Sequence, residues 1–211
     1  MIPNEEDKRK IGDYVVLNSM KIGYKEIVIG EDINAFEGQR YLCCFVEHNA
    51  IFEHYNEAIV SDNYAEIVKE FGERIKESAD KILQEQELTE KAIGDDSEWF
   101  IDRCDPISID DCIENKVLVI NGDYLRPEFR RASRQLVLCT GGFGAQPNPR
   151  GRSCYCINLY DGKKACYYRS DVLGTVEPEN LPDWAKTGLE RAKEIAANEK
   201  TPIKGERDEA R

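Results

Sequence analysis

Short runs of β-branched and aromatic residues alternate with polar residues over the first sixty positions of the chain. The run YVVLNSMKIGYKEIVIGED, which starts at Tyr14 and is interrupted at Lys21–Gly23, has the pattern of two strands joined by a hairpin turn. Arg40–Glu47 and the shorter Glu57–Val60 predict further strands. The residues from 48 to 56 are too polar and turn-rich to predict an element. This part of the chain therefore favours a small antiparallel sheet.

A helical period replaces the strand pattern from Asn63 to about Glu87. Apolar residues recur there at steps of three and four, as on one face of an amphipathic helix. They are Tyr64, Ile67, Val68, Phe71, Ile75, Ile82 and Leu83. Ser61, Asp62 and Asn63 are N-cap candidates, and Glu66 places a carboxylate in the first turn, where the helix dipole favours it. We expect this helix to pack on the sheet.

The pattern changes again after residue 88. Residues 89–115 lose the helical period and carry acids, a glycine and a proline, which indicates a linker or an irregular connection. Four runs of strand-forming residues follow, at Lys116–Ile120, Arg134–Thr140, Ser153–Tyr160 and Lys164–Val176. Their spacing favours a small barrel or a curled antiparallel sheet. The segment LPDWAKTGLERAKEIAANE then begins a last helix, with Pro182 near the first helical position.

Together these elements predict an α+β protein with two domains. The first would combine an N-terminal antiparallel sheet with one long amphipathic helix. The second would be a small barrel-like or curled antiparallel sheet followed by a helix. The expected boundaries are an acidic α+β domain at 1–88, a connection at 89–115, a β-rich domain with its helix at 116–200 and a frayed tail at 201–211.

Charge is distributed unevenly along the 211 residues, which carry a net charge of −12. Residues 1–115 hold 28 acidic and 12 basic residues, a net of −16, whereas residues 116–175 hold 4 acidic and 10 basic residues, a net of +6. The acidic part disfavours nucleic acid and favours a basic protein surface, while the basic part can meet phosphates. The acidic candidates for contact with a partner lie on the outer face of the predicted helix: Glu66, Glu70, Glu73, Glu77 and Asp80.

Eight cysteines raise the question of metal binding. No apolar run approaches the roughly 18 residues that span a membrane, and the charged N-terminus has no apolar signal core, so we expect a cytoplasmic protein. Cysteines in that reducing compartment are free thiols or metal ligands. Zinc sites repeat cysteine pairs two to four residues apart, often with histidine, but this chain has no such repeat and only His48 and His54. We therefore predict buried free thiols, no metal and no cofactor.

A glycine-rich stretch, LVLCTGGFGAQPNPRGRSCYC, runs from Leu136 to Cys156. A dinucleotide-binding loop would lead into a helix whose N-terminus binds the phosphates, but Pro147, Pro149 and another predicted strand follow these glycines. The Gly-Lys-Ser/Thr of a Walker loop is absent. No nucleophile motif lies near either histidine, and the abundant carboxylates form no pair at a defined spacing. The sequence therefore predicts no catalytic residue and no enzyme.

The same stretch fits a long connection between two antiparallel strands, in which glycines take positive φ and prolines stiffen the return. Phe143 at its tip either folds back onto the end of the sheet or contacts a partner, and we favour the contact. Arginines beside an exposed aromatic ring can stack on bases or anchor a protein interface. The candidates for a nucleic-acid site are Arg130, Arg131, Arg134, Arg150, Arg152 and Arg169.

Several segments of the chain resemble one family of small proteins from mobile elements. These segments are YLRPEFR from Tyr124, RQLVLCTGGFG from Arg134 with the following RGRSCYCINLYDG, and RSDVLGTVEPENLPDWA from Arg169. IGYKEIVIG and DNYAEIVKEFGERI extend the resemblance over most of the chain. The family occurs on conjugative elements and prophages of gut Firmicutes, often near antirestriction genes. The resemblance implies a genomic setting rather than a mechanism.

That setting implies two candidate functions. Small acidic proteins of such elements often block host immunity by occupying the basic surface of a nuclease, which can be a restriction enzyme or a CRISPR effector with its guide RNA. The resemblance and the charge therefore predict a non-enzymatic anti-defence protein that uses the acidic helix face or the glycine loop. The alternative is a nucleic-acid-binding accessory protein of the element that uses the basic β domain. Neither function involves a membrane, and the oligomeric state stays open.

Overall fold

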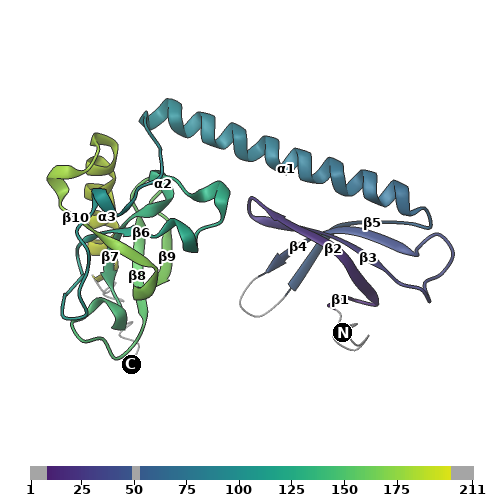
Figure 1. Cartoon of the computed structure of the whole chain (residues 1–211), viewed down its shortest axis with the longest axis horizontal. Coiled ribbons are helices and arrows are strands. Elements are labelled where there is room, and N and C mark those ends of the chain that lie inside the picture. Colours follow the sequence, from purple (N-terminus) through teal and green to yellow (C-terminus); the bar gives the residue numbers. More distant parts are fainter. Residues whose placement is uncertain (1–8, 49–52, 201–211) are drawn as a thin grey trace, which may run out of the picture. The chain divides into compact units, whose positions relative to one another are not determined.

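The computed structural model describes residues 9–48 and 53–200 of the chain. These residues form an α+β fold that divides into two units, Met1–Leu88 and Thr89–Arg211 (Figure 1). Each unit is built on its own antiparallel sheet. The predicted frayed tail at 201–211 lies outside the described residues.

The alternating residues of the first unit form a five-stranded sheet whose strands follow the order of the chain. The strands are β1 (Lys10–Ile11), β2 (Tyr14–Ile22), β3 (Lys25–Glu31), β4 (Tyr41–His48) and β5 (Glu53–Ser61). The predicted hairpin is confirmed, because Ile22 of β2 pairs with Lys25 of β3. Strand β5 begins at Glu53 rather than at Glu57, because residues 53–56 pair with β4 across a shift in register.

Helix α1 (Tyr64–Ile93) lies along one face of this sheet (Figure 1). Asn63 caps its start, since the side-chain Oδ1 accepts a hydrogen bond from the backbone N–H of Ala65 at 3.0 Å. The buried Ile67 packs with Ile27, Ile29 and Cys43 of the sheet. The helix runs past its predicted end near Glu87, because none of the residues from 88 to 93 is a glycine or a proline.

The helix stripe that packs on the sheet is narrower than predicted. Ile67 and Ile82 are buried, and Phe71 and Ile75 are half-buried. The predicted stripe residues that stay exposed are Tyr64, Val68 and Leu83. A helix turns by about 100° per residue, so Val68 and Leu83 point roughly 60° and 120° away from the centre of the buried arc. The sheet contacts mainly the residues near that centre.

The opposite face of the sheet buries an aliphatic cluster that includes the short strand β1. The cluster consists of Ile11, Val28, Leu42, Cys44 and Val46. Glu26, on the same strand as Val28, is only 2% exposed and accepts two hydrogen bonds from the guanidinium of Arg9, at 2.7 and 3.1 Å. A buried charge needs such a partner, so Arg9 and Glu26 hold β1 against the sheet.

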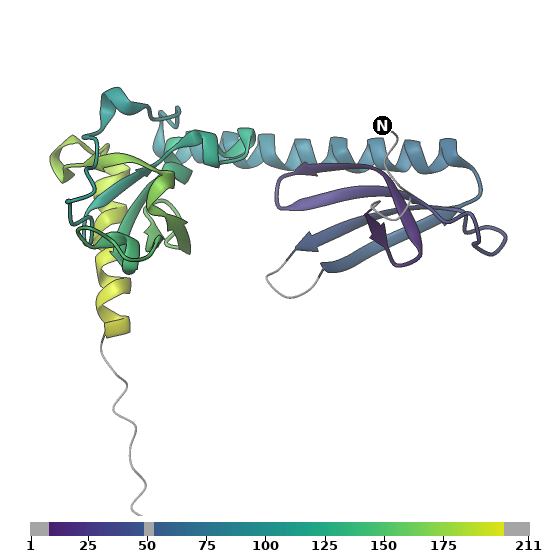
Figure 2. The ribbon, with the colours of Figure 1, turned by 60° about the horizontal axis from the view of Figure 1, so that its bottom comes forward.

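The second unit contains a five-stranded curled sheet (Figure 2). Its strand order is β10-β6-β7-β8-β9. Its strands are β6 (Val117–Ile120), β7 (Leu136–Gly141), β8 (Ser153–Asn158), β9 (Lys164–Tyr168) and β10 (Val172–Val176). The single strand predicted for Lys164–Val176 is therefore wrong. Arg169–Asp171 forms a 3-10 turn, after which β10 pairs with β6 at the far edge. Because β9 and β10 occupy opposite edges, the sheet is open rather than a closed barrel.

Both faces of this second sheet are covered. Helix α3 (Asp183–Lys200) packs on one face, where Ala185, Leu189 and Ala192 meet a cluster that includes Leu136 and Ile157 (Figure 2). The other face buries a second cluster. Its members are Ile113, Leu118, Ile120, Val137, Cys139, Ala145, Cys154, Cys156 and Val172. The predicted C-terminal helix is thus confirmed, with Pro182 immediately before its first residue.

The segment interpreted as a linker, 89–115, is packed into the second unit. Gln135, in the short helix α2 (Ala132–Gln135), is fully buried beneath it. The Gln135 amide donates to the carbonyls of Trp99 and Ile120 at 3.0 and 2.9 Å, and its Oε1 accepts from the Trp99 N–H at 2.8 Å. Trp99 itself lies in the core under α3. One side chain therefore ties the connecting segment to the sheet.

Candidate interaction surfaces

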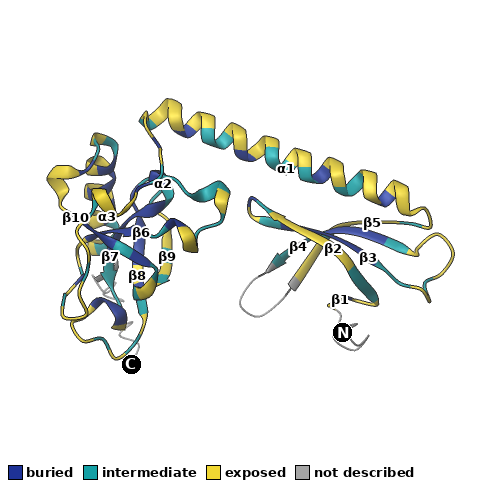
Figure 3. Ribbon diagram, viewed as in Figure 1, coloured by how far each residue is buried: buried dark blue, intermediate teal, exposed yellow. Residues whose placement is uncertain are grey.

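Helix α1 is exposed along much of the side that does not meet the sheet (Figure 3). The acidic residues predicted on this helix recur on one side of it. The row consists of Glu66, Glu70, Glu73, Glu77 and Asp80, at alternating steps of four and three residues. At about 100° per residue, these five positions fall within an arc of roughly 80°. The arc is centred well away from the stripe that packs on the sheet. The structure therefore aligns the predicted acids along the exposed side of α1.

The acids of this row differ in whether a neighbouring side chain already binds their carboxylate. Glu70 lies 2.6 Å from Nε of Arg74, whose side chain is 7% exposed and stacks over the ring of Phe45. Glu70 is therefore part of the packing. Glu66 accepts a hydrogen bond from Ser61 at 2.7 Å, and Glu73 has only an exposed pair with Lys69.

Glu77 and Asp80 are exposed at the centre of the helix, and neither carboxylate has a partner among the described residues. Exposed pairs such as Lys69–Glu73 contribute little and leave the carboxylate able to exchange partners. Three of the five acids, Glu73, Glu77 and Asp80, can therefore offer their charge to another molecule.

A loop between β3 and β4 carries the most exposed large apolar side chains of the described residues. Phe36 is 84% exposed and Ile33 is 76% exposed. Exposed apolar side chains on an ordered loop are typical of the anchors of protein interfaces. This loop was not among the sites predicted from the sequence. The signal was present, since Ile33 and Phe36 are two apolar residues inside a polar, turn-rich segment between predicted strands.

Hydrogen bonds to its backbone hold this loop in place. The carboxylate of Asp62, just before α1, accepts from the N–H groups of Gly38 at 2.7 Å and Arg40 at 3.1 Å. These bonds lower the pKa of Asp62, the bond from Gly38 most of all. The hydroxyl of Tyr14 donates to the carbonyl of Gln39 at 2.7 Å. The loop is therefore fixed to the start of the helix that carries the acidic row.

The six predicted arginines of the second unit are not equally available. Arg130 donates to the Leu125 carbonyl, Arg131 pairs with Glu90, and Arg134 pairs with Asp161. Arg169 donates to three backbone carbonyls, those of Gly144, Ser108 and Asp111, at 2.7 to 2.9 Å. Arg150 and Arg152 are exposed, and their guanidinium groups have no partner among the described residues. Only these two retain a fully free charge for a ligand.

Phe143 lies on the glycine loop and is 74% exposed, so it does not fold back onto the sheet. Two glycines allow the loop backbone to lie directly against the start of β8. A Cβ on Gly142, which has φ of +110°, would lie 2.3 Å from the Ser153 carbonyl oxygen, and one on Gly144 would lie 2.3 Å from the Arg152 oxygen. The glycines therefore permit a close backbone contact that leaves the Phe143 ring outside.

Strands β8 and β9 present a pair of exposed aromatic residues that were not among the predicted site residues. Tyr155 and Tyr168 are each 54% exposed. Tyr155 lies opposite Cys166, and Tyr168 lies opposite Ser153, so both rings leave the same face of the sheet. The alternation in SCYCINLY could have revealed this, because it sends the cysteines to one face and Tyr155 to the other.

Three buried cysteines meet on the opposite face of that sheet. Cys139 of β7 pairs with Cys156 of β8, and Cys154 belongs to the same cluster. Hydrogen bonds from Cys154 and Cys156 lower the pKa of the Cys139 thiol, whereas the bond to Cys139 and then burial raise the pKa of the other two. Within residues 9–48 and 53–200, no group of three or more histidine, cysteine, aspartate or glutamate residues is arranged to hold a metal ion.

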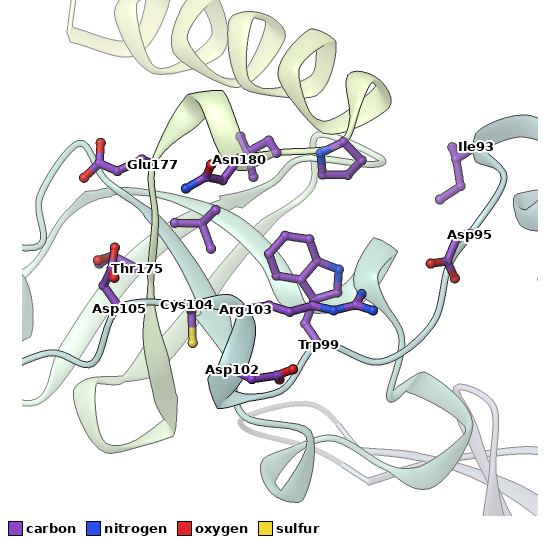
Figure 4. Close-up of a pocket in the computed structure, with 13 residues that line it drawn as sticks. Ile93, Asp95, Trp99, Asp102, Arg103, Cys104, Asp105, Thr175, Glu177 and Asn180 are labelled. Atoms are coloured by element: carbon purple, nitrogen blue, oxygen red, sulfur yellow. The ribbon is translucent and has the colours of Figure 1, made fainter.

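A cavity of about 700 Å³ opens in the second unit beside Trp99 (Figure 4). Acidic side chains dominate its polar lining, and the guanidinium of Arg103 lies 5.8 Å from the Trp99 ring centre. Cys104 also lines it, but burial and the nearby charges of Asp105 and Asp102 raise the pKa of its thiol. A protonated thiol is a poor nucleophile, so Cys104 is poorly suited to nucleophilic attack.

Comparisons of this chain with protein-family models, with curated proteins and with solved structures found no match. Among the described helices, none combines the length and the apolar character needed to cross a membrane. The functional inference therefore depends on the surfaces of the two units.

Proposed function

We propose that this protein is a non-enzymatic anti-defence inhibitor that binds a host defence nuclease through its first unit. The observation that carries the proposal is the connection of an apolar loop to the helix that carries the acidic row. An ordered loop exposes Ile33 and Phe36, and Asp62 fixes that loop to the helix whose outer face carries the acidic row. The resemblance to proteins of mobile elements supports the same conclusion.

The two features are complementary in what they would contribute to binding. Apolar anchors on a pre-ordered loop bury surface at a low entropy cost, and they supply most of the affinity in typical interfaces. A row of carboxylates is attracted to the basic channel in which a nuclease holds its nucleic acid. Glu73, Glu77 and Asp80 would therefore occupy sites that otherwise bind phosphates. A restriction enzyme and a CRISPR effector with its guide RNA both offer such a channel.

The test is protection of phage from host defence. The full chain is expressed beside a panel of restriction and CRISPR systems, and phage plaques are counted. We expect plaque numbers to recover with at least one system. A Phe36→Ala variant and a triple Glu73→Gln, Glu77→Gln, Asp80→Asn variant should both lose this protection.

The matched control removes the same number of negative charges from the second unit. Asp110→Asn with Glu179→Gln and Glu194→Gln neutralises three exposed acids of the second unit and should retain protection. If no defence system is inhibited, or if the control loses as much protection as the α1 triple variant, the proposal is wrong.

A second candidate function is that of a nucleic-acid-binding accessory protein that uses the second unit. The observation in its favour is that the free guanidinium groups of Arg150 and Arg152 flank the loop with the exposed Phe143. Binding that depends on phosphate contacts weakens steeply as salt increases. An Arg150→Gln, Arg152→Gln double variant should therefore weaken oligonucleotide binding at low salt. The acidic-row variant should bind oligonucleotides as the unchanged protein does, which separates the two functions.

A further inference from the structure

The outer face of β8 and β9 has two aromatic rings at diagonal positions. In the antiparallel register, Tyr155 faces Cys166 while Ser153 faces Tyr168, so the two tyrosines are offset by one pair of residues. Diagonal neighbours of this kind are separated by about 7–8 Å at their Cα atoms. Both rings are more than half exposed. Together they form a tyrosine platform, a name used below for Tyr155 and Tyr168.

The helix that covers this face stops short of the tyrosine platform. Ile157 lies two residues beyond Tyr155 on β8, so both side chains point to the same side of the sheet. Ile157 is buried in the cluster beneath α3, whereas Tyr155 remains exposed. The cover provided by α3 therefore ends between these two positions. The platform is the part of the face that α3 leaves open.

The charge around the tyrosine platform favours an anionic ligand. Residues 136–169 contain five basic residues and a single acidic residue, Asp161. Asp161 is already matched by Arg134 at 3.5 Å and Lys163 at 3.3 Å. Arg152, whose guanidinium is free among the described residues, comes directly before β8, and the pairing of Ile157 with Lys164 sets Lys164 on the platform's face.

We propose that the tyrosine platform binds a single strand of nucleic acid by stacking its bases on Tyr155 and Tyr168. Exposed rings stack on any unpaired base, and nearby basic side chains hold the backbone. A duplex keeps its bases paired and about 3.4 Å apart, so it cannot supply a separate base face to each of two rings about 7–8 Å apart. The proposal rests on the second candidate function and adds to it the ligand class and the residues that recognise it.

Binding is measured by fluorescence anisotropy with labelled oligonucleotides of about 12 nucleotides, a typical site size for such surfaces. Oligo-dT and oligo-U distinguish DNA from RNA, and a duplex of equal length tests strandedness. We expect at least one single strand to bind more tightly than the duplex at low salt. Tyr155→Ala and Tyr168→Ala should each weaken that binding about tenfold.

Matched variants separate stacking from other effects. Tyr155→Phe with Tyr168→Phe retains both rings and should restore the binding that the alanine variants lose. Tyr124→Ala removes another exposed tyrosine of the same unit and should leave binding unchanged. Binding that survives the double alanine variant but is lost in the Arg150→Gln, Arg152→Gln variant would support the second candidate function and overturn the platform. Failure to bind any oligonucleotide at low salt would overturn both.

A chemical footprint gives an independent readout. Cys166 lies on the platform's face, directly opposite Tyr155 and two residues before Tyr168, and both Cys166 and Cys112 are exposed. We expect a bound single strand to slow alkylation of Cys166 severalfold and to leave alkylation of Cys112 unchanged. Equal rates for Cys166 with and without a bound strand would place the ligand elsewhere and overturn the proposal.

Discussion

The carboxylate of Asp62 accepts a hydrogen bond from the backbone N–H of Gly38 at 2.7 Å and so connects the start of α1 to the loop that exposes Phe36. The bond from Gly38, followed by that from Arg40, lowers the pKa of Asp62. A carboxyl group with a lowered folded-state pKa stabilises the fold above its unfolded pKa of about 3.9. That contribution is lost as the pH falls through the lower, folded value. We expect the order of the loop to follow the same dependence.

The first prediction is that Asp62→Ala will loosen the loop. The N–H groups of Gly38 and Arg40 should exchange with deuterium roughly tenfold faster, because each loses a charged acceptor. Lowering the pH of the unchanged protein below about 4 should shift the resonances of both N–H groups together. In the exchange experiment, Asn34, whose N–H bonds to Asp32 in the same loop, serves as the control. Identical exchange in the variant and the unchanged protein would show that Asp62 does not order the loop.

The second prediction separates two acids of the same row. Glu70→Gln should lower the free energy of unfolding by about 3 kcal/mol, because it leaves the buried Arg74 charge without its carboxylate. Within the described part of the chain, Nη1 of Arg74 already has no hydrogen-bond partner. Glu77→Gln, on the exposed side, should change stability by less than about 0.5 kcal/mol. Chemical denaturation of both variants checks this, and equal effects would contradict it.

The third prediction concerns two arginines of the second unit. Arg169→Gln removes the donors to the carbonyls of Gly144, Ser108 and Asp111, and it should destabilise the unit by about 2–4 kcal/mol. Arg150→Gln changes an exposed side chain and should have almost no effect on the melting temperature. Thermal unfolding followed by near-ultraviolet circular dichroism distinguishes the two. A stable Arg169→Gln variant would mean that this side chain is available for a ligand.

The fourth prediction tests the glycine loop. Phe143→Ala should leave the melting temperature nearly unchanged, because the ring is mostly exposed, whereas a buried phenylalanine would cost about 3–5 kcal/mol. Gly142→Ala should be clearly destabilising, because its Cβ would collide with the Ser153 carbonyl oxygen at a φ of +110°. Calorimetry of both variants checks the contrast. A large loss of stability in Phe143→Ala would assign the ring to the fold rather than to a surface.

Local periods predicted much of the fold from the sequence. The hairpin of β2 and β3, helix α1 and helix α3 each follow from apolar spacing within one short segment. The position of β10 at the opposite edge from β9 could not be predicted from the sequence, because Lys164–Val176 has a continuous strand pattern. What divides it is the turn at Arg169, whose guanidinium binds carbonyls 25 to 61 residues away. Contacts over that distance leave no periodic signal.

For the candidate surfaces too, local spacing predicted some features and long-range contacts determined the others. The acidic row followed from spacing alone, because every residue of a helix face is set by the helical turn. Spacing did not predict that Glu70 is engaged while Glu77 is exposed, since this difference depends on where Arg74 meets the sheet. The exposed Phe36 was missed because an apolar residue in a loop has no pattern that says whether other elements cover it. Of the predicted arginines, spacing could not distinguish the engaged from the free.

The edge of the first sheet has a consequence for solubility. Strand β5 forms that edge and exposes Tyr55, Ile59 and Val60. A straight apolar edge of this kind can recruit strands from other copies and lead to aggregation. Here Glu57 takes a φ of +54°, and the register with β4 shifts between Cys43 and Phe45. The register shift interrupts the ladder to which a second chain would pair, so we expect it to disfavour self-templated assembly.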